Sequence, residues 1–274
     1  MASVPGGTGG FGGSDDPIDG VLAQLDEILA WCIDNGSRAG YFAALYRRVT
    51  RTVRQRIGTG YFDDDARMEV LDVTFASRYL QAFSQWRSGD PAISACWRVA
   101  FDGVADPTLL ILQNLLVGMN AHITYDLGIA TAQVAATPAG LASIHGDFDK
   151  INALLACLVP TVFAELGTLS PLIHLLEDMG EDDEQKLVNV AMEAARDFAW
   201  LFANELVIVR GDPDLEQTLL DLKDKEASWI GDRLLHPGGS VEKVCHVVWL
   251  AESKDVARNI EVLAAPEVLP ASCG

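Results

Sequence analysis

Basic residues are scarce in this sequence. Its 274 residues include 20 lysines and arginines against 39 aspartates and glutamates, which gives a formal net charge of -19 at pH 7. A protein with this excess of acid repels the phosphates of nucleic acids and of anionic lipids. We therefore expect it to bind neither nucleic acid nor a membrane.

Cysteine is also scarce, and no two cysteines form a C-x-x-C pair. The chain has five, and an odd number fits free thiols in a reducing compartment better than a disulfide framework. Residues 1–16 are rich in glycine but lack the charged and apolar regions of a secretory signal. We expect a flexible tail over these residues, a cytoplasmic location, and either a monomer or a homodimer.

The motifs of well-known cofactor sites are missing as well. The sequence has no Walker motif, no G-x-S-x-G and no haem-attachment motif. A G-x-G-x-x-G run from Gly7 to Gly12 follows no predicted strand, so we assign it to the tail instead of a phosphate-binding loop. We therefore favour a protein that works without an organic cofactor.

The sequence does contain a series of helix starts. Asp-Pro and Ser-Pro pairs place a capping oxygen directly before a proline, which suits the first helical position because its missing N–H would have no partner there. Between these pairs, apolar residues recur in steps of three and four, as from Met68 to Trp86. The pattern predicts an all-α fold with a single domain over 17–265 and a C-terminal tail over 266–274. The expected helices span residues 18–33, 39–57, 63–87, 91–102, 107–136, 148–166, 171–179, 183–209, 213–235 and 240–263.

The helix expected at 107–136 is the central element of this prediction. From Thr108 to Ala136, only His122 and Asp126 ionise near neutral pH. A stretch of this length and composition could cross a membrane. Its amide side chains and its acidic, amphipathic neighbours instead favour a helix buried at the centre of a bundle. Polar groups buried there must find partners, so they are the first candidates for a site.

A candidate site follows from His122, Asp126 and Asp149. The first two lie four residues apart and therefore share one face of the central helix. Asp149 lies near the start of the next expected helix, where Asp147 could act as a cap. We expect His122, Asp126 and Asp149 to be catalytic. The residues expected to contact a ligand are Asn120, Tyr125, Asn152, Tyr79 and Trp97.

Three interpretations of this cluster stay open. In the first, His122 and Asp126 are a hydrogen-bonded pair of the core with no role in chemistry. In the second, His122, Asp126 and Asp149 bind a divalent metal such as Zn²⁺, for which imidazole and carboxylate are suitable ligands. In the third, which we favour, no metal is bound. Asp126 then orients His122 as a general acid or base, while Asp149 acts opposite.

Several runs of residues resemble a bacterial, all-helical family of domains of unknown function. The most specific is its G-M-N-A-H-x-x-x-D-L signature, here Gly118-Met119-Asn120-Ala121-His122 followed by Asp126-Leu127. The likeness covers residues 40–205 and implies a helical fold with a polar centre at His122, Asp126 and Asp149, but no established activity. Its other runs include Tyr46, Val49-Thr50, Met68-Glu69, Leu71-Asp72-Val73, Phe75-Ala76, Arg78-Tyr79-Leu80, Trp97, Ala100-Phe101, Asp147-Phe148-Asp149, Ile151-Asn152, Ala195-Arg196 and Ala199-Trp200.

A more distant likeness is to zinc-dependent phospholipases C and P1-type nucleases, which are helical and use H-x-x-x-D metal ligands. The chain lacks their further ligand histidines and their amino-terminal tryptophan ligand. This likeness implies a zinc-dependent phosphoesterase, which is our second hypothesis.

An apolar helical enclosure with few ionisable groups suits a hydrophobic ligand with a polar reacting centre. We therefore expect a cofactor-independent enzyme that uses acid–base catalysis on a hydrophobic small molecule, such as a polyketide-type metabolite. The reaction would be a cyclisation, dehydration or isomerisation, for example the formation of a ketal or cyclic ether. The alternatives are a divalent-metal-dependent hydrolase that uses the same residues and a non-catalytic protein that binds an apolar ligand.

Overall fold

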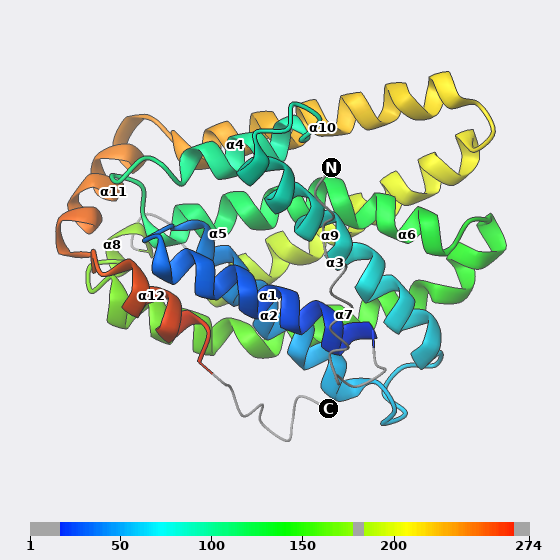
Figure 1. Cartoon of the computed structure of the whole chain (residues 1–274), viewed down its shortest axis with the longest axis horizontal. Helices are drawn as coiled ribbons and strands as arrows, with labels where there is room; N and C mark the ends of the chain where they lie inside the picture. Colours follow the sequence, from blue (N-terminus) through cyan, green and yellow to red (C-terminus); the bar gives the residue numbers. More distant parts are fainter. Residues whose placement is uncertain (1–16, 178–183, 266–274) are drawn as a thin grey trace, which may run out of the picture.

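The protein is built from helices over the residues that the computed structural model describes, 17–177 and 184–265. The all-α prediction is confirmed, and the tails expected at 1–16 and 266–274 lie outside the described residues. Most of the long helices run close to the long axis of the molecule (Figure 1). The elements are α1 (Pro17–Asp34), α2 (Ala39–Arg56), α3 (Asp65–Ser88), α4 (Ala95–Gly103), α5 (Ile111–Asn120), the π-helix η1 (Ala121–Leu127), α6 (Gly128–Val134), α7 (Pro138–Leu169), α8 (His174–Glu177), α9 (Glu184–Val209), α10 (Pro213–Leu235), α11 (Gly239–Ala251) and α12 (Val256–Leu263).

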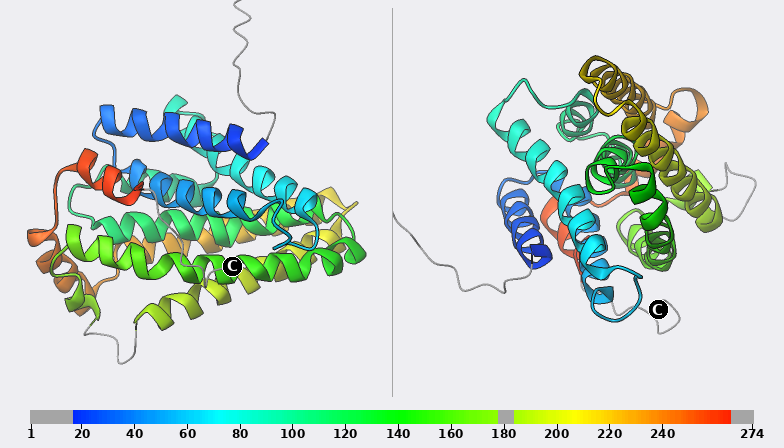
Figure 2. Two further views of the ribbon diagram at one scale, coloured as in Figure 1. Left: turned by 90° about the horizontal axis from the view of Figure 1, so that it is seen from below. Right: turned by 90° about the vertical axis from the view of Figure 1, so that its right-hand side faces the viewer.

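The elements α5, η1 and α6 follow one another without a break and form a central rod over residues 111–134. The rod packs against α2, α3, α4, α9 and α10, and the end-on view of Figure 2 shows it near the middle of the bundle. The prediction of a buried central helix is therefore right, except for its start. Asp106 and Pro107 form a turn, in which Thr108 N donates to Asp106 Oδ1 at 2.8 Å.

Gly118 allows α2 to lie close against this rod. A Cβ atom at Gly118 would come within 2.5 Å of Cγ of Phe42 on α2, so a larger residue would displace this ring. The Phe42 ring then contacts the rings of Tyr46 and His122, with centroids 5.9 and 5.8 Å away. The glycine of the signature therefore brings an aromatic face of α2 to the histidine of the signature.

Helix α7 departs most from the prediction. It begins at Pro138 instead of residue 148, and the Thr137 side chain caps it by accepting a backbone hydrogen bond at 3.0 Å. Thr137 and Pro138 are a helix start of the same kind as the Asp-Pro pairs, and the prediction overlooks it. As a result, Asp147 and Asp149 lie inside a helix and not at its start.

Three other predicted boundaries are wrong. The Asp90-Pro91 and Ser170-Pro171 pairs form turns, and the segment 240–263 is divided into α11 and α12. The break between these two helices supports the central rod. The side chain of Glu252, just after α11, accepts a hydrogen bond at 3.0 Å from the backbone N–H of Ile111, the first residue of α5.

Helix α7 also carries Cys157, which is disulfide-bonded to a partner outside the described residues. Cys32, Cys96 and Cys245 are free. The expectation of free thiols is therefore wrong for Cys157, and the cysteines no longer support a reducing compartment. By length and composition alone, α7 is the one helix of the described chain that could cross a membrane, a test that core helices of soluble proteins also pass.

Candidate active site

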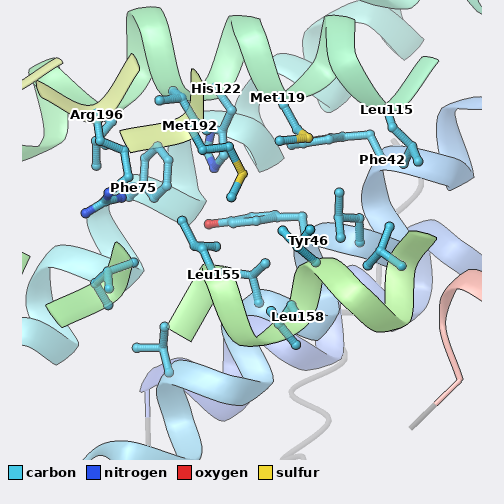
Figure 3. A pocket seen from close by; sticks show the side chains of 18 of the residues that line it. Phe42, Tyr46, Phe75, Leu115, Met119, His122, Leu155, Leu158, Met192 and Arg196 are labelled. Carbon is cyan, nitrogen blue, oxygen red and sulfur yellow. The ribbon is translucent and has the colours of Figure 1, made fainter. Parts of the chain in front are cut away.

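A cavity of about 150 Å³ lies between the central rod and helices α2, α3, α7 and α9 (Figure 3). Its walls are mostly aliphatic and aromatic side chains. The polar and charged side chains that line it are Tyr46, Asp72, His122 and Arg196. Cavities of this size accept a small apolar molecule. A few polar groups in an apolar pocket are typical of ligand sites, so these four residues define the candidate site.

His122 and Asp126 interact as the sequence predicts. His122 Nδ1 lies 3.1 Å from Asp126 Oδ2, and the two side chains are 3% and 1% exposed. Both residues belong to η1, the π-helical segment of the rod. Such segments within α-helices are frequent at functional sites, because they change the direction in which a few side chains point.

Two more donors hold Asp126 in place. Arg78 Nε on α3 donates to Oδ1 at 2.8 Å, and Trp97 Nε1 on α4 donates to Oδ2 at 2.8 Å. An ionised carboxylate only accepts hydrogen bonds, so the His122 imidazole must donate its Nδ1 proton to Asp126. In the neutral ring, Nε2 then carries a lone pair and no proton.

This second nitrogen of His122 is buried and has no hydrogen-bond partner among the described residues. The ring lies at the cavity wall, stacked on Phe75 with centroids 3.6 Å apart and edge-on to Tyr46 at 4.5 Å (Figure 3). Burial lowers the pKa of His122 below its ordinary value, although the hydrogen bond to Asp126 acts in the opposite direction. The imidazole is therefore neutral at pH 7 and available as a base.

Asp72 on α3 and Tyr46 on α2 place two acidic protons at the same cavity. Burial raises the pKa of Asp72 to about 7, and Asp72 Oδ2 has no hydrogen-bond partner in the described part of the chain. Burial, and then the charge of Asp72, raise the pKa of the Tyr46 hydroxyl well above its ordinary value. Near pH 7 Tyr46 therefore keeps its proton, and Asp72 is protonated in about half of the molecules.

Arg196 on α9 brings a cation to the cavity. The residue is 4% exposed. Its Nη2 donates to the carbonyl oxygen of Phe148 at 2.7 Å, and its guanidinium lies 4.3 Å from the centre of the Phe148 ring. Burial lowers the pKa of Arg196 to about 10, against the attraction of Asp149 and Asp197, so the group stays charged at pH 7.

Asp149 does not join His122 and Asp126, and this part of the prediction is wrong. Its side chain is 50% exposed, and its Oδ2 lies 3.7 Å from Nε2 of His145, one turn earlier on α7. The physical reason is that α7 begins at Pro138, so Asp149 is an exposed residue within the helix and not part of the first turn, where the prediction places it. Of the three residues predicted to be catalytic, the structure therefore brings only His122 and Asp126 together.

Asp147 does not cap its own helix but holds the backbone just before α3, whose N-cap is Asp64. Its buried carboxylate accepts hydrogen bonds from the backbone N–H groups of Asp63 and Asp64, at 2.7 and 3.0 Å, directly before α3. Lys150 Nζ donates to the same carboxylate at 2.9 Å. Burial acts to raise the pKa of Asp147, but these hydrogen bonds outweigh it and lower the pKa.

None of the residues expected to contact a ligand lines this cavity. Trp97 lies behind it and holds Asp126, and Tyr79 packs against Trp97 with ring centroids 5.3 Å apart. These two side chains support the pair instead of a ligand. The lining instead includes Phe42 and Phe75, and both Tyr79 and Trp97 contact the ring of Phe42, with centroids 5.2 and 5.8 Å apart.

The other three expected contacts also lie outside the cavity lining. Asn120 Nδ2 donates to the carbonyl oxygen of Ala227 at 2.7 Å, which ties the rod to α10. The Tyr125 ring lies 5.5 Å from the guanidinium of Arg78. Asn152 is partly buried on α7 and has no place in the cavity lining.

The residues considered as metal ligands do not form a ligand set. The two oxygens of Asp126 accept hydrogen bonds from Arg78 and Trp97, and Asp149 lies apart on α7. Over the described residues, no group of three or more His, Cys, Asp or Glu side chains is arranged to hold a metal ion. The donor set of the second hypothesis therefore does not fit a metal, and we derive no step through one.

The sequence analysis missed Tyr46, Asp72 and Arg196 as site residues. Charged residues on amphipathic helices usually face water, so periodicity alone gives no reason to select Asp72 or Arg196. The signal that could have found them is the family resemblance, because all three stand in its runs.

A family model described as a family of unknown function matches residues 18–237. The chain belongs to this family, DUF5995. The DUF5995 match includes the central rod and every polar residue of the cavity, and it confirms the family that the signature indicates. The chain matches no curated protein and no solved structure. Phospholipases C and P1-type nucleases therefore gain no support, and the function must be argued from the site.

Proposed function

We propose that the protein is an enzyme that moves protons on a hydrophobic small molecule bound in the cavity. The observation that carries this proposal is His122 Nε2, a buried base at an apolar cavity with no hydrogen-bond partner in the described part of the chain. Leaving a buried polar atom unpaired costs free energy, roughly 1–3 kcal/mol, so a ligand group that pairs with it is expected.

Asp126 makes His122 suited to this task. The carboxylate accepts the Nδ1 proton and keeps Nε2 free, and it stabilises the imidazolium that forms when Nε2 takes a proton. Arg78 and Trp97 hold the carboxylate in this orientation. The arrangement therefore fixes both the tautomer and the direction of the base.

Asp72 and Tyr46 take the place that the prediction gave to Asp149. Both line the cavity with His122, and either can donate a proton to an oxygen atom of the ligand. A base and an acid in one apolar enclosure support isomerisation, dehydration or ring closure, in which a proton leaves one atom of the ligand and another arrives elsewhere.

A carrier for an apolar ligand is a second candidate, because the cavity walls are almost wholly apolar. A carrier needs no base. In that case His122 and Asp126 serve the stability of the protein, and a bound ligand leaves unchanged.

The ring opening of 5-nitrobenzisoxazole tests the proposal without knowledge of the natural substrate. A base that removes its C3 proton releases a coloured phenolate. We expect the wild type to accelerate this reaction above buffer and His122→Gln to lower the protein-dependent rate about 100-fold or more. His145→Gln, which changes an exposed histidine on α7, is the matched control and should keep the wild-type rate.

Two results would contradict the proposal. One is a wild type that binds the probe, as seen by tryptophan fluorescence, but does not open its ring, which favours a carrier. The other is an equal rate in wild type and His122→Gln, which places the reaction elsewhere on the protein.

A further inference from the structure

We infer that the cavity takes a hydrophobic carboxylic acid, whose carboxylate binds Arg196 and whose apolar part extends toward Leu115 and Phe42. The inference rests on the proposed function only in placing the ligand in the same cavity. It concerns binding, so it can fail or succeed independently of proton transfer.

The first argument is that Arg196 has no counter-ion among the residues that the structure describes. The guanidinium is 4% exposed, and no carboxylate of the described residues lies within 4.0 Å of it. Its Nε is buried without a hydrogen-bond partner among those residues. Asp149 and Asp197 attract it only from a greater distance, and both are exposed.

The second argument is the cost of such a charge. A buried ion without a partner costs several kcal/mol, and buried arginines in proteins are normally paired. A carboxylate matches the geometry of a guanidinium, because two parallel N–H groups can meet its two oxygens. The Nε–H of Arg196 is unused, and the hydrogen bond to Phe148 occupies one N–H of Nη2. Nη2 has a second N–H, so this group and Nε–H can together donate to the two oxygens of one carboxylate.

The third argument is the distribution of polarity along the cavity. Figure 3 shows Arg196 toward one end, Leu115 and Phe42 toward the other, and His122 and Tyr46 between them. A ligand with its carboxylate at Arg196 therefore places its apolar part against the aliphatic and aromatic walls. The base then faces atoms between the carboxylate and the far end of the ligand.

The charge balance favours a single carboxylate over a phosphate ester. Among the described residues, the cavity lining holds one cation, Arg196, and one acid, Asp72. A dianion would leave one negative charge without a partner in an apolar enclosure, next to a carboxyl group that resists ionisation there. A monocarboxylate meets the one guanidinium and adds no further charge.

Isothermal titration with octanoate, octan-1-ol and octylamine at pH 7 tests the inference. These three probes share one chain and differ in the end group. We expect octanoate to bind wild type about tenfold more tightly than octan-1-ol, and octylamine to bind least. Arg196→Gln should lower the affinity for octanoate about tenfold or more and leave that for octan-1-ol within about threefold, because only the carboxylate loses a charged partner.

Arg210→Gln is the matched control, because Arg210 also donates to a backbone carbonyl, that of Ala132, but is exposed. It should bind octanoate as wild type does. The inference is overturned if octanoate and octan-1-ol bind wild type equally, if neither binds, or if Arg196→Gln keeps the preference for octanoate. If Arg196→Gln does not fold, two measurements test the inference instead. They are the preference of the wild type among the three probes and the same preference in Arg196→Lys.

His122→Gln separates this inference from the proposed function. It should keep the preference for octanoate over octan-1-ol while losing the reaction with 5-nitrobenzisoxazole. Loss of that reaction without any preference for octanoate supports proton transfer and refutes the carboxylate site. A preference for octanoate together with an unchanged reaction rate in His122→Gln supports the carboxylate site and refutes proton transfer by His122.

Discussion

Asp126 in the rod and Asp147 in α7 are carboxylates of nearly equal burial, 1% and 2% exposed, with different surroundings. Asp147 accepts hydrogen bonds from two backbone N–H groups and Lys150, and Lys150 also donates to the exposed Asp63, so this network leads to the surface. The network of Asp126 continues through His122 to a nitrogen without a partner at an apolar cavity. Burial of an acid therefore does not by itself mark a site. What distinguishes Asp126 is its hydrogen bond to a histidine that lines a cavity.

Alanine substitution of each acid should give the largest contrast. Asp126→Ala leaves Arg78 and Trp97 without an acceptor inside the core and should lower the free energy of unfolding by about 3–5 kcal/mol. Asp147→Ala should cost about 2 kcal/mol, because Lys150 and the start of α3 lie nearer to water. Urea unfolding measures both, and equal losses would remove the distinction.

The conservative variants sharpen the same comparison through activity. Asp126→Asn should lower the rate with 5-nitrobenzisoxazole about 100-fold, because the amide can offer His122 an N–H and favour the wrong tautomer. Asp147→Asn should leave the rate unchanged. A loss of rate in Asp147→Asn would show that the start of α3 matters for the site.

Asp72 should have a smaller effect that depends on pH. Burial raises its pKa to about 7, so the folded chain holds a proton that the unfolded chain releases near pH 4. Stability from this group is present below pH 4 and is lost as the pH rises to 7. The rise of the pKa to about 7 corresponds to roughly 4 kcal/mol at full burial, and the partial exposure of Asp72 reduces this value. Asp72→Asn should therefore be more stable than wild type by about 2 kcal/mol at pH 8, and close to wild type at pH 4.

Thermal and urea unfolding between pH 4 and pH 8 check this expectation. Asp149→Asn is the control, since its exposed side chain should change stability by less than about 0.5 kcal/mol at either pH. A difference between wild type and Asp72→Asn that does not vary with pH would show that Asp72 is ionised throughout.

His122 should have the smallest effect on stability. Its pKa in the folded chain lies below the ordinary value, so the unfolded chain binds a proton first as the pH falls below about 6.5. Wild type should therefore lose about 1 kcal/mol more than His122→Gln between pH 7 and pH 5.5. The pKa of Asp147 is lowered, so its contribution is lost only as the pH falls below 4. Overlap of the two pH ranges would contradict the assignments.

The sequence was sufficient for the helices whose signals are local. Asp212 and Pro213 start α10 as predicted, with Leu215 N donating to Asp212 Oδ1 at 3.2 Å. At Asp90 the same dipeptide forms a turn, because the side chain bonds to the N–H two residues later instead of three. The choice between cap and turn depends on packing of the following residues, which the dipeptide does not contain.

The candidate site also has a part that local spacing predicts and a part that depends on the packing of distant helices. His122 and Asp126 are four residues apart on one helix, so spacing alone predicts their hydrogen bond. Asp72 and Arg196 are 124 positions apart in the chain, and only the packing of α3 and α9 around the rod brings them to one cavity. The prediction for Asp149 is wrong because α7 begins ten residues earlier than expected, so Asp149 is an exposed residue within the helix and not part of its first turn.

The protonation state of His122 is the most direct test of the central claim, and ¹⁵N NMR of the imidazole nitrogens measures it in the wild type. We predict a neutral ring at pH 7 with the proton on Nδ1 and none on Nε2, and a pKa below 6.5. His122→Gln identifies the signals. An imidazolium at pH 7, or a neutral ring with its proton on Nε2, would contradict the account, because neither form leaves a free base facing the cavity.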